Sequence, residues 1–207
     1  MSSLKRLERK FLKSLNEQCV LHFSTAHPHA DHYDGVVMAI KPDFIVIREE
    51  RDWEFDGIQI FPKRSICDIR DGKFEACANR IVRGNNVLSQ VVIPEWLTEC
   101  QCLADVLQAM QQQEFWPAVE TLADNDRDYF FYLGPITKLG KKSFAIHAYD
   151  ADGQWEQEYE IEHSEVFRIE LESRYCDHFN NYMKSQPVTN SRKTKTKSHD
   201  KKKRTGK

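Results

Sequence analysis

Short runs rich in valine, isoleucine, phenylalanine and tyrosine alternate with polar turns along most of the chain. Runs of this length and composition are typical of antiparallel β-strands. They fall into two groups of five. The expected strands cover residues 20–24, 33–40, 44–49, 57–61 and 65–70 in the first group, and residues 118–121, 129–137, 143–149, 155–161 and 165–171 in the second. We therefore predict a mainly β fold built from two small units.

Helices are expected on both sides of each group of strands. Apolar residues recur at helical spacing over residues 4–15, ahead of the first group, and over residues 103–110, ahead of the second. After the fifth strand of each group, short helices are expected to begin near Phe74 and Tyr175. Each unit is thus predicted to consist of a helix, five strands and a short terminal helix.

The two groups also match each other position by position, at a spacing of about a hundred residues. The matching pairs are Tyr33 with Tyr132, Gly35 with Gly134, Phe44 with Phe144, Trp53 with Trp155, Ile60 with Ile161, Ile69 with Ile169, Phe74 with Tyr175 and Asn79 with Asn180. A chance match would rarely hold register over so many bulky positions. The sequence therefore predicts an internal repeat.

Composition divides the chain further. Of its 30 basic and 32 acidic residues, nine basic and one acidic residue lie in residues 191–207, which gives this tail a charge of +8 and the remainder −10. A segment with so few apolar residues cannot offset the entropy of ordering, so we expect a disordered basic arm. The predicted units are a helix and barrel at 1–83, a connector at 84–99, a second helix and barrel at 100–185, and the tail at 186–207.

A helix followed by five strongly bent strands, with glycine in the second strand, resembles the Sm-like and SH3-like small barrels, here as a tandem protein of a bacterial type. This resemblance implies a mainly β fold with accessory helices, formed by two repeated helix-plus-five-stranded barrels, and a role in RNA metabolism. In Sm proteins RNA bases bind at the turns between strands two and three and between strands four and five. Those turns hold Lys41-Pro42-Asp43 and Pro62-Lys63-Arg64 in the first unit, and residues 139–142 and 162–164 in the second.

The run from residue 155 to residue 169 is also similar to the strand pattern of WYL-type regulatory barrels. On these grounds we expect a non-enzymatic binding or regulatory module, with RNA or another nucleic acid as the leading ligand. Lysines and arginines would neutralise phosphates, either in the turns or in the tail. The candidate contacts are Lys41, Lys63, Arg64, Lys141, Lys142, Arg192, Lys193, Lys195, Lys197, Lys201, Lys202, Lys203 and Arg204. The tail has an alternative role, in which it folds back onto the acidic body.

Two other functions fit parts of the sequence. A protein-interaction adaptor would use edge strands or the barrel groove to hold a peptide. A metal-dependent hydrolase would use the H-x-H-x-D-H segment, whose His27, His29, Asp31 and His32 have the spacing by which metallo-β-lactamase-like hydrolases hold zinc. Those hydrolases place the motif after a first sheet of several tens of residues, whereas about two dozen residues precede it here. The segment is therefore predicted to be a loop between the first two strands, with metal binding as a minor alternative.

Other patterns receive a structural interpretation. The acidic run Glu49-Glu50 with Asp52 is interpreted as the solvated outer face of a strand, and Trp53 and Trp155 as core residues at the barrel edges. The sequence contains no P-loop, G-x-G-x-x-G or nucleophile elbow, and we expect no cofactor. Six cysteines without C-x-x-C spacing are expected to be reduced thiols.

No run of about 18 apolar residues occurs, and residues 1–15 carry charges throughout. Neither a membrane-spanning helix nor a secretory signal is therefore expected, and we predict a cytoplasmic protein without a membrane partner. The choice between RNA, DNA and a protein partner and the oligomeric state stay open at this point.

Overall fold

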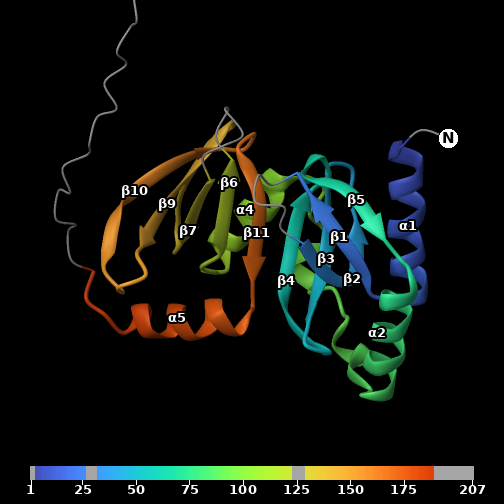
Figure 1. Ribbon diagram of the computed structural model, residues 1–207. Helices are drawn as coiled ribbons and strands as arrows, with labels where there is room; N and C mark the ends of the chain where they lie inside the picture. Colours follow the sequence, from blue (N-terminus) through green and yellow to red (C-terminus); the bar gives the residue numbers. More distant parts are fainter. Residues whose placement is uncertain (1–2, 27–31, 123–128, 189–207) are drawn as a thin grey trace, which may run out of the picture.

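The computed structural model describes residues 3–26, 32–122 and 129–188 (Figure 1). In the first half, helix α1 precedes five strands and helix α2 follows them. The bounds are α1 Ser3–Glu17, β1 Leu21–Thr25, β2 His32–Ile40, β3 Phe44–Arg51, β4 Glu54–Pro62, the 3-10 turn η1 Lys63–Ser65, β5 Ile66–Arg70 and α2 Lys73–Gly84. The five strands expected in this half are all present, with ends that differ by a few residues.

The second half is reached through two short turns, η2 (Val87–Gln90) and α3 (Glu95–Thr98). Its elements are α4 Leu103–Gln112, β6 Ala118–Leu122, β7 Tyr129–Leu133, β8 Ile136–Leu139, β9 Ser143–Tyr149, β10 Trp155–Glu162, β11 Val166–Leu171 and α5 Arg174–Lys184. One predicted strand, residues 129–137, is divided into β7 and β8. The interruption lies at Gly134, which has a φ of +153°, and at Pro135, which has no N–H to donate to a neighbouring strand.

The strands of the described residues form two antiparallel sheets. The larger has the order β5-β1-β2-β3-β4-β11-β6-β7, and the smaller has the order β10-β9-β8. The halves are joined where β4 pairs with β11, with Ile60 opposite Ile169. Both sheets are open, so the expected pair of closed barrels is not confirmed. In the first half β4 pairs with β11 of the other half and not with β5, and the ladder therefore runs on across the junction.

The order of pairing is nevertheless alike in the two halves. The first half has β5-β1-β2-β3-β4, and the second has the corresponding order in two pieces, β11-β6-β7 and β8-β9-β10. The two glycines that match in the sequence, Gly35 and Gly134, each lie in close contact with the backbone of another strand. A Cβ at Gly35 would lie 2.5 Å from the Arg48 carbonyl oxygen, and a Cβ at Gly134 would lie 2.2 Å from the His147 carbonyl oxygen. At both positions two backbones approach too closely for any other residue.

The matched asparagines also act alike, each joining the last helix of its half to the segment before the first strand. The Asn79 side chain accepts from the Val20 N–H at 2.7 Å and donates to the Val20 carbonyl at 3.0 Å. The Asn180 side chain donates to the Trp116 carbonyl at 2.8 Å and accepts from the Tyr149 hydroxyl at 2.7 Å. These contacts fix α2 and α5 at corresponding places.

A shared hydrophobic core connects the halves. Helix α4 contributes Val106, Leu107 and Met110, which are fully buried, and they belong to the same cluster as Val46 of β3 and Ile146 of β9. Burial of such side chains stabilises by about 1.5–3 kcal/mol each. Helix α4 packs against β8, while α1 packs against β2 and covers the outer side of the first half (Figure 1). Within the described residues, every helix is too short or too polar to cross a bilayer.

Candidate functional site

A cavity of about 540 Å³ opens where the two halves meet, and we call it the junction cavity. The first half supplies the start of β2, the end of β3 with the turn that follows it, and the start of α2. The second half supplies side chains from the middle of β6 and β11. The lining residues are His32, Tyr33, Asp34, Glu49, Glu50, Arg51, Asp52, Trp53, Phe74, Glu120 and Arg168. The cavity therefore depends on the pairing of β4 with β11.

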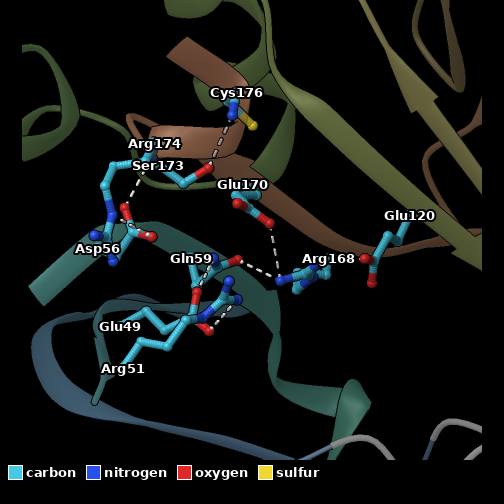
Figure 2. Close-up of polar contacts among 10 residues, drawn as sticks. All are labelled: Glu49, Arg51, Asp56, Gln59, Glu120, Arg168, Glu170, Ser173, Arg174 and Cys176. Atoms are coloured by element: carbon cyan, nitrogen blue, oxygen red, sulfur yellow. Dashed lines mark hydrogen bonds and ion pairs between the residues drawn. The ribbon is translucent and has the colours of Figure 1, made fainter. Parts of the chain in front are cut away.

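Arg168 is the buried centre of the polar contacts beside this cavity (Figure 2). Its Nη2 pairs with the Glu120 carboxylate, and its Nη1 donates to Glu170 Oε2 at 3.1 Å and to Gln59 Oε1 at 3.0 Å. The guanidinium carbon also lies 4.8 Å from the centre of the Tyr33 ring. Burial alone would lower the pKa of Arg168, but the Glu120 carboxylate raises it above the ordinary value. The charge is thus held inside the protein by its partners.

The polar contacts continue from Gln59 to the end of β3. Gln59 Nε2 donates to Glu49 Oε2 at 2.6 Å, and Arg51 Nη2 donates to Glu49 Oε1 at 2.9 Å. Burial raises the pKa of Glu49, and it raises the pKa of Glu50, where the Asp34 and Asp52 carboxylates add to the effect. The cavity wall therefore contains carboxyl groups that take up a proton more readily than ordinary ones. The interpretation of Glu49 and Glu50 as a solvated outer face was wrong, because both are buried.

The turn between β3 and β4 has an unusual backbone. Asp52 and Trp53 both have positive φ, at 54° and 68°, in a two-residue connection where Asn-Gly is the preferred pair. A bulky residue in this region costs about 1–2 kcal/mol. The Trp53 N–H donates to Glu50 Oε1 at 2.5 Å, which fixes the turn. Trp53 is half-buried and its ring lies 6.4 Å from that of Phe74, so it is a wall of the cavity and not a core residue.

The basic residues predicted in four different turns come together at another place, which we call the turn cluster (residues 41–43, 62–65, 140–142 and 162–165). The Lys63 N–H donates to the Asp43 carbonyl at 2.8 Å, which joins the β2–β3 turn to the β4–β5 turn. Arg64 Nη2 donates to the carbonyls of His163, Ser164 and Val166 at 3.3, 2.9 and 2.7 Å. The His163 N–H in turn donates to the Lys142 carbonyl at 2.8 Å. Turns of both halves are thereby in direct contact.

Two of the five basic side chains in the turn cluster already have partners. Lys41 Nζ donates to the Thr98 carbonyl at 2.6 Å, and Arg64 binds two carbonyls of the β10–β11 turn and that of Val166 at the start of β11. Lys63 is half-buried, while Lys141 and Lys142 are exposed. The same turns contain three carboxylates, Asp43, Glu162 and Glu165. The eight tail candidates, from Arg192 to Arg204, lie outside the described residues.

The predicted metal-binding segment is described only at its end. His27, His29 and Asp31 lie outside the described residues, whereas His32 is exposed at the start of β2, its ring 4.9 Å from that of His22. Among the described residues, one group of possible ligand atoms is compact, formed by His22, Asp34 and Glu75.

Three of the four carboxylate oxygens of this group already have partners. Glu75 accepts from Arg70 Nε at 2.7 Å and from the Gly72 N–H at 2.6 Å, and His22 Nδ1 lies 3.0 Å from Asp34 Oδ1. A metal ion would have to compete with the Arg70 guanidinium for the Glu75 carboxylate. The stronger arrangement in the described residues is therefore the junction cavity.

Comparison of the chain with protein-family models, curated proteins and solved structures finds no significant match. Sequence reasoning did not predict the junction cavity, and it missed Glu120 and Arg168 altogether. One local signal was present, because both are charged residues within otherwise apolar strands, as in Val119-Glu120-Thr121 and Phe167-Arg168-Ile169. Alternating positions of this kind usually face solvent, and nothing local indicates that the other half covers them.

Proposed function

We propose that this protein is a non-enzymatic module that binds single-stranded nucleic acid, RNA first of all, at the turn cluster. The proposal rests on one observation, namely that four turns distant in the sequence contact one another and carry Lys63, Lys141 and Lys142. None of these three ammonium groups pairs with a carboxylate within the described part of the chain. They are free to neutralise phosphates of one strand.

Two further features support the same ligand. The nine basic residues after position 190 add a flanking positive charge to an otherwise acidic chain. The mainly β halves, with five strands in the first and six in the second, each after a helix, are also compatible with the resemblance to Sm-like small barrels. Arg64 has a positioning role in this proposal, because it holds the β10–β11 turn against the β4–β5 turn through three carbonyls.

The test is a salt titration of the full chain with fluorescently labelled oligouridylate and, in parallel, with duplex DNA. The triple variant Lys63→Ala, Lys141→Ala, Lys142→Ala should weaken oligouridylate binding and reduce the slope of log K against log salt by about 2, since each phosphate contact contributes about 0.7 for single strands. The matched control is Lys5→Ala, Arg9→Ala, Lys73→Ala, which removes the same charge from exposed positions on α1 and α2.

Equal effects of the two triple variants would contradict the proposed surface, because only total charge would then matter. Absence of oligouridylate binding at low salt would contradict the function itself and favour a protein-interaction adaptor. Replacement of the nine basic tail residues by serine measures the contribution of the tail separately.

A further inference from the structure

We propose that the junction cavity is a binding site for an organic cation, an alkylammonium group that retains N–H donors, carried by a free polyamine or by a lysine side chain of another protein. This site is separate from the turn cluster and does not depend on nucleic-acid binding. Its volume of about 540 Å³ is far larger than a metal ion requires and lies in the range of small-molecule sites.

The charges that line the cavity favour a cation. Five carboxylates face two guanidinium groups, and both guanidiniums are already paired, Arg51 with Glu49 and Arg168 with Glu120 and Glu170. An excess of three carboxylates remains, on Asp34, Glu50 and Asp52. Across the described residues no lysine or arginine pairs with any of these three, and Asp34 contacts His22.

Two of these carboxylates stand opposite each other in the sheet. Asp34 of β2 is the direct cross-strand neighbour of Glu50 of β3. Like charges in this position repel and weaken strand pairing. A bound ammonium group between them would turn the repulsion into two attractions. The arrangement is therefore one that a cationic ligand stabilises.

A buried acceptor supplies a second, independent indication. Glu120 is almost fully buried and lines the cavity, and its Oε2 has no hydrogen-bond partner among the described residues. The Glu120 carboxylate pairs with Arg168 (Figure 2) and also interacts with the Tyr129 hydroxyl, yet its Oε2 is left without a partner. Buried polar atoms are rarely left without a partner. An N–H of an alkylammonium ligand would satisfy this oxygen, whereas a fully methylated ammonium would not.

The aromatic side chains that line the cavity favour an organic cation over an inorganic one. Trp53 and Phe74 form one wall, and the Phe74 side chain is 60% exposed. Rings of this cavity already receive cations from the chain itself, since Arg168 lies over Tyr33 and the Arg70 guanidinium lies 5.9 Å from the centre of Phe74. Trp53 occupies a turn position at which glycine would be the unstrained residue. We attribute the indole at this strained position to contact with the ligand.

The experiment is calorimetric titration of the full chain at low salt with spermidine, putrescine, a blocked lysine peptide and Mg²⁺. At least one amine probe should bind about tenfold or more tighter than Mg²⁺, because the inorganic ion gains nothing from the aromatic wall. Tighter binding of spermidine assigns a free polyamine as the source of the alkylammonium group. Tighter binding of the lysine peptide assigns a protein side chain.

Three variants test the site. Trp53→Gly should lower amine affinity about tenfold without lowering the melting temperature, because glycine accepts the positive φ that tryptophan does not. Asp52→Asn keeps the turn, since asparagine also tolerates positive φ, and should weaken amine binding through loss of one charge. The matched control, Asp43→Asn in the β2–β3 turn, should leave affinity unchanged.

Several results would overturn the proposal. Equal affinity for Mg²⁺ and the amines, or equal losses in Asp52→Asn and Asp43→Asn, would show that only general charge attraction operates. Unchanged amine binding in Trp53→Gly would exclude the aromatic wall. A lower melting temperature in Trp53→Gly would show that the indole serves packing. Retained oligouridylate binding in these variants separates this site from the turn cluster.

Discussion

The two halves of the protein use the same tryptophan position for different purposes. Trp155 is 7% exposed and packs against Trp116, Tyr149 and His147, with ring centroids 5.6, 5.7 and 4.7 Å away. Trp53, at the matching position, lies half-buried in a strained two-residue turn beside a cavity. In the second half this tryptophan belongs to the core, whereas in the first half it lines the junction cavity. Two positions that match in the sequence thus place their indoles in different surroundings.

The pairing of the last strand with the first strand shows a similar contrast. Ser24 stands opposite Asp68 in the first half, and Glu120 stands opposite Arg168 in the second. Asp68 pairs with Arg6 at 2.9 Å, and both side chains are more than half exposed. The Glu120–Arg168 pair is buried because the first half covers it. Cover by the other half, and not the position on the strand, therefore decides whether an ion pair here is buried.

The largest expected effect is a difference in stability between variants of the two tryptophans. Trp155→Ala removes a buried indole and should lower the free energy of unfolding by about 3–5 kcal/mol. Trp53→Ala should cost less than about 1 kcal/mol, because the side chain is only half-buried and the turn is strained. Urea denaturation of both variants measures the difference. Similar losses would contradict the division of roles between the halves.

The buried ion pair should give the next effect. Glu120→Ala leaves the Arg168 guanidinium with Glu170 and Gln59 only, and should destabilise by about 3 kcal/mol. Asp68→Ala, which breaks the exposed pair with Arg6, should cost less than about 1 kcal/mol. The triple variant Glu120→Ala, Arg168→Met, Glu170→Gln removes the buried guanidinium together with both of its carboxylate partners and should be more stable than Glu120→Ala alone. Failure of this rescue would indicate that volume, and not charge, sets the cost.

The matched glycines should respond alike. Gly35→Ala and Gly134→Ala each place a Cβ within 2.5 Å of a carbonyl oxygen, and each should destabilise by about 1–3 kcal/mol. Gly84→Ala is the control, because no atom lies within 4 Å of its added Cβ and it ends helix α2. That substitution should be neutral or slightly stabilising. Thermal unfolding of the three variants tests whether the close approach is a property of both halves.

The smallest effect concerns pH. Burial raises the pKa of Glu50, so its contribution to stability is complete below the ordinary carboxylate pKa and is lost as pH rises through the raised value. Glu75 is the opposite case. Burial opposes ionisation there, but hydrogen bonds from Arg70 and Gly72 lower its pKa, so its contribution is present at neutral pH and lost as pH falls.

Substitution by glutamine should change the stability of the protein in opposite directions at Glu50 and at Glu75. At neutral pH Glu50→Gln should be more stable than the parent chain and Glu75→Gln less stable. Both differences should shrink on acidification, as measured by urea denaturation between pH 4 and pH 8. The same sign for both variants at neutral pH would contradict the distinction between the cavity carboxyl and the helix-capping carboxyl.

Most of the local structure could be predicted from the sequence. Apolar alternation and turn residues located nine of the ten expected strands as single segments and the helices before and after each group. The matches of Gly35 with Gly134 and of Asn79 with Asn180 identified positions with the same backbone contacts in both halves. These features are determined by the sequence because strand propensity, helical periodicity and the steric needs of glycine act over a few neighbouring residues.

The tertiary structure alone decided how the halves join and what the junction contains. Pairing of β4 with β11 depends on which strand edges stay free and how they face each other, and no local pattern encodes that choice. The same pairing buries Arg168 and Glu120, closes the cavity beside Trp53 and brings Arg64 onto carbonyls of the other half. The sequence around a charged residue in a strand looks the same whether that face of the strand is exposed to solvent or covered by another part of the protein. Its burial is set by the partner surface, which only the folded chain provides.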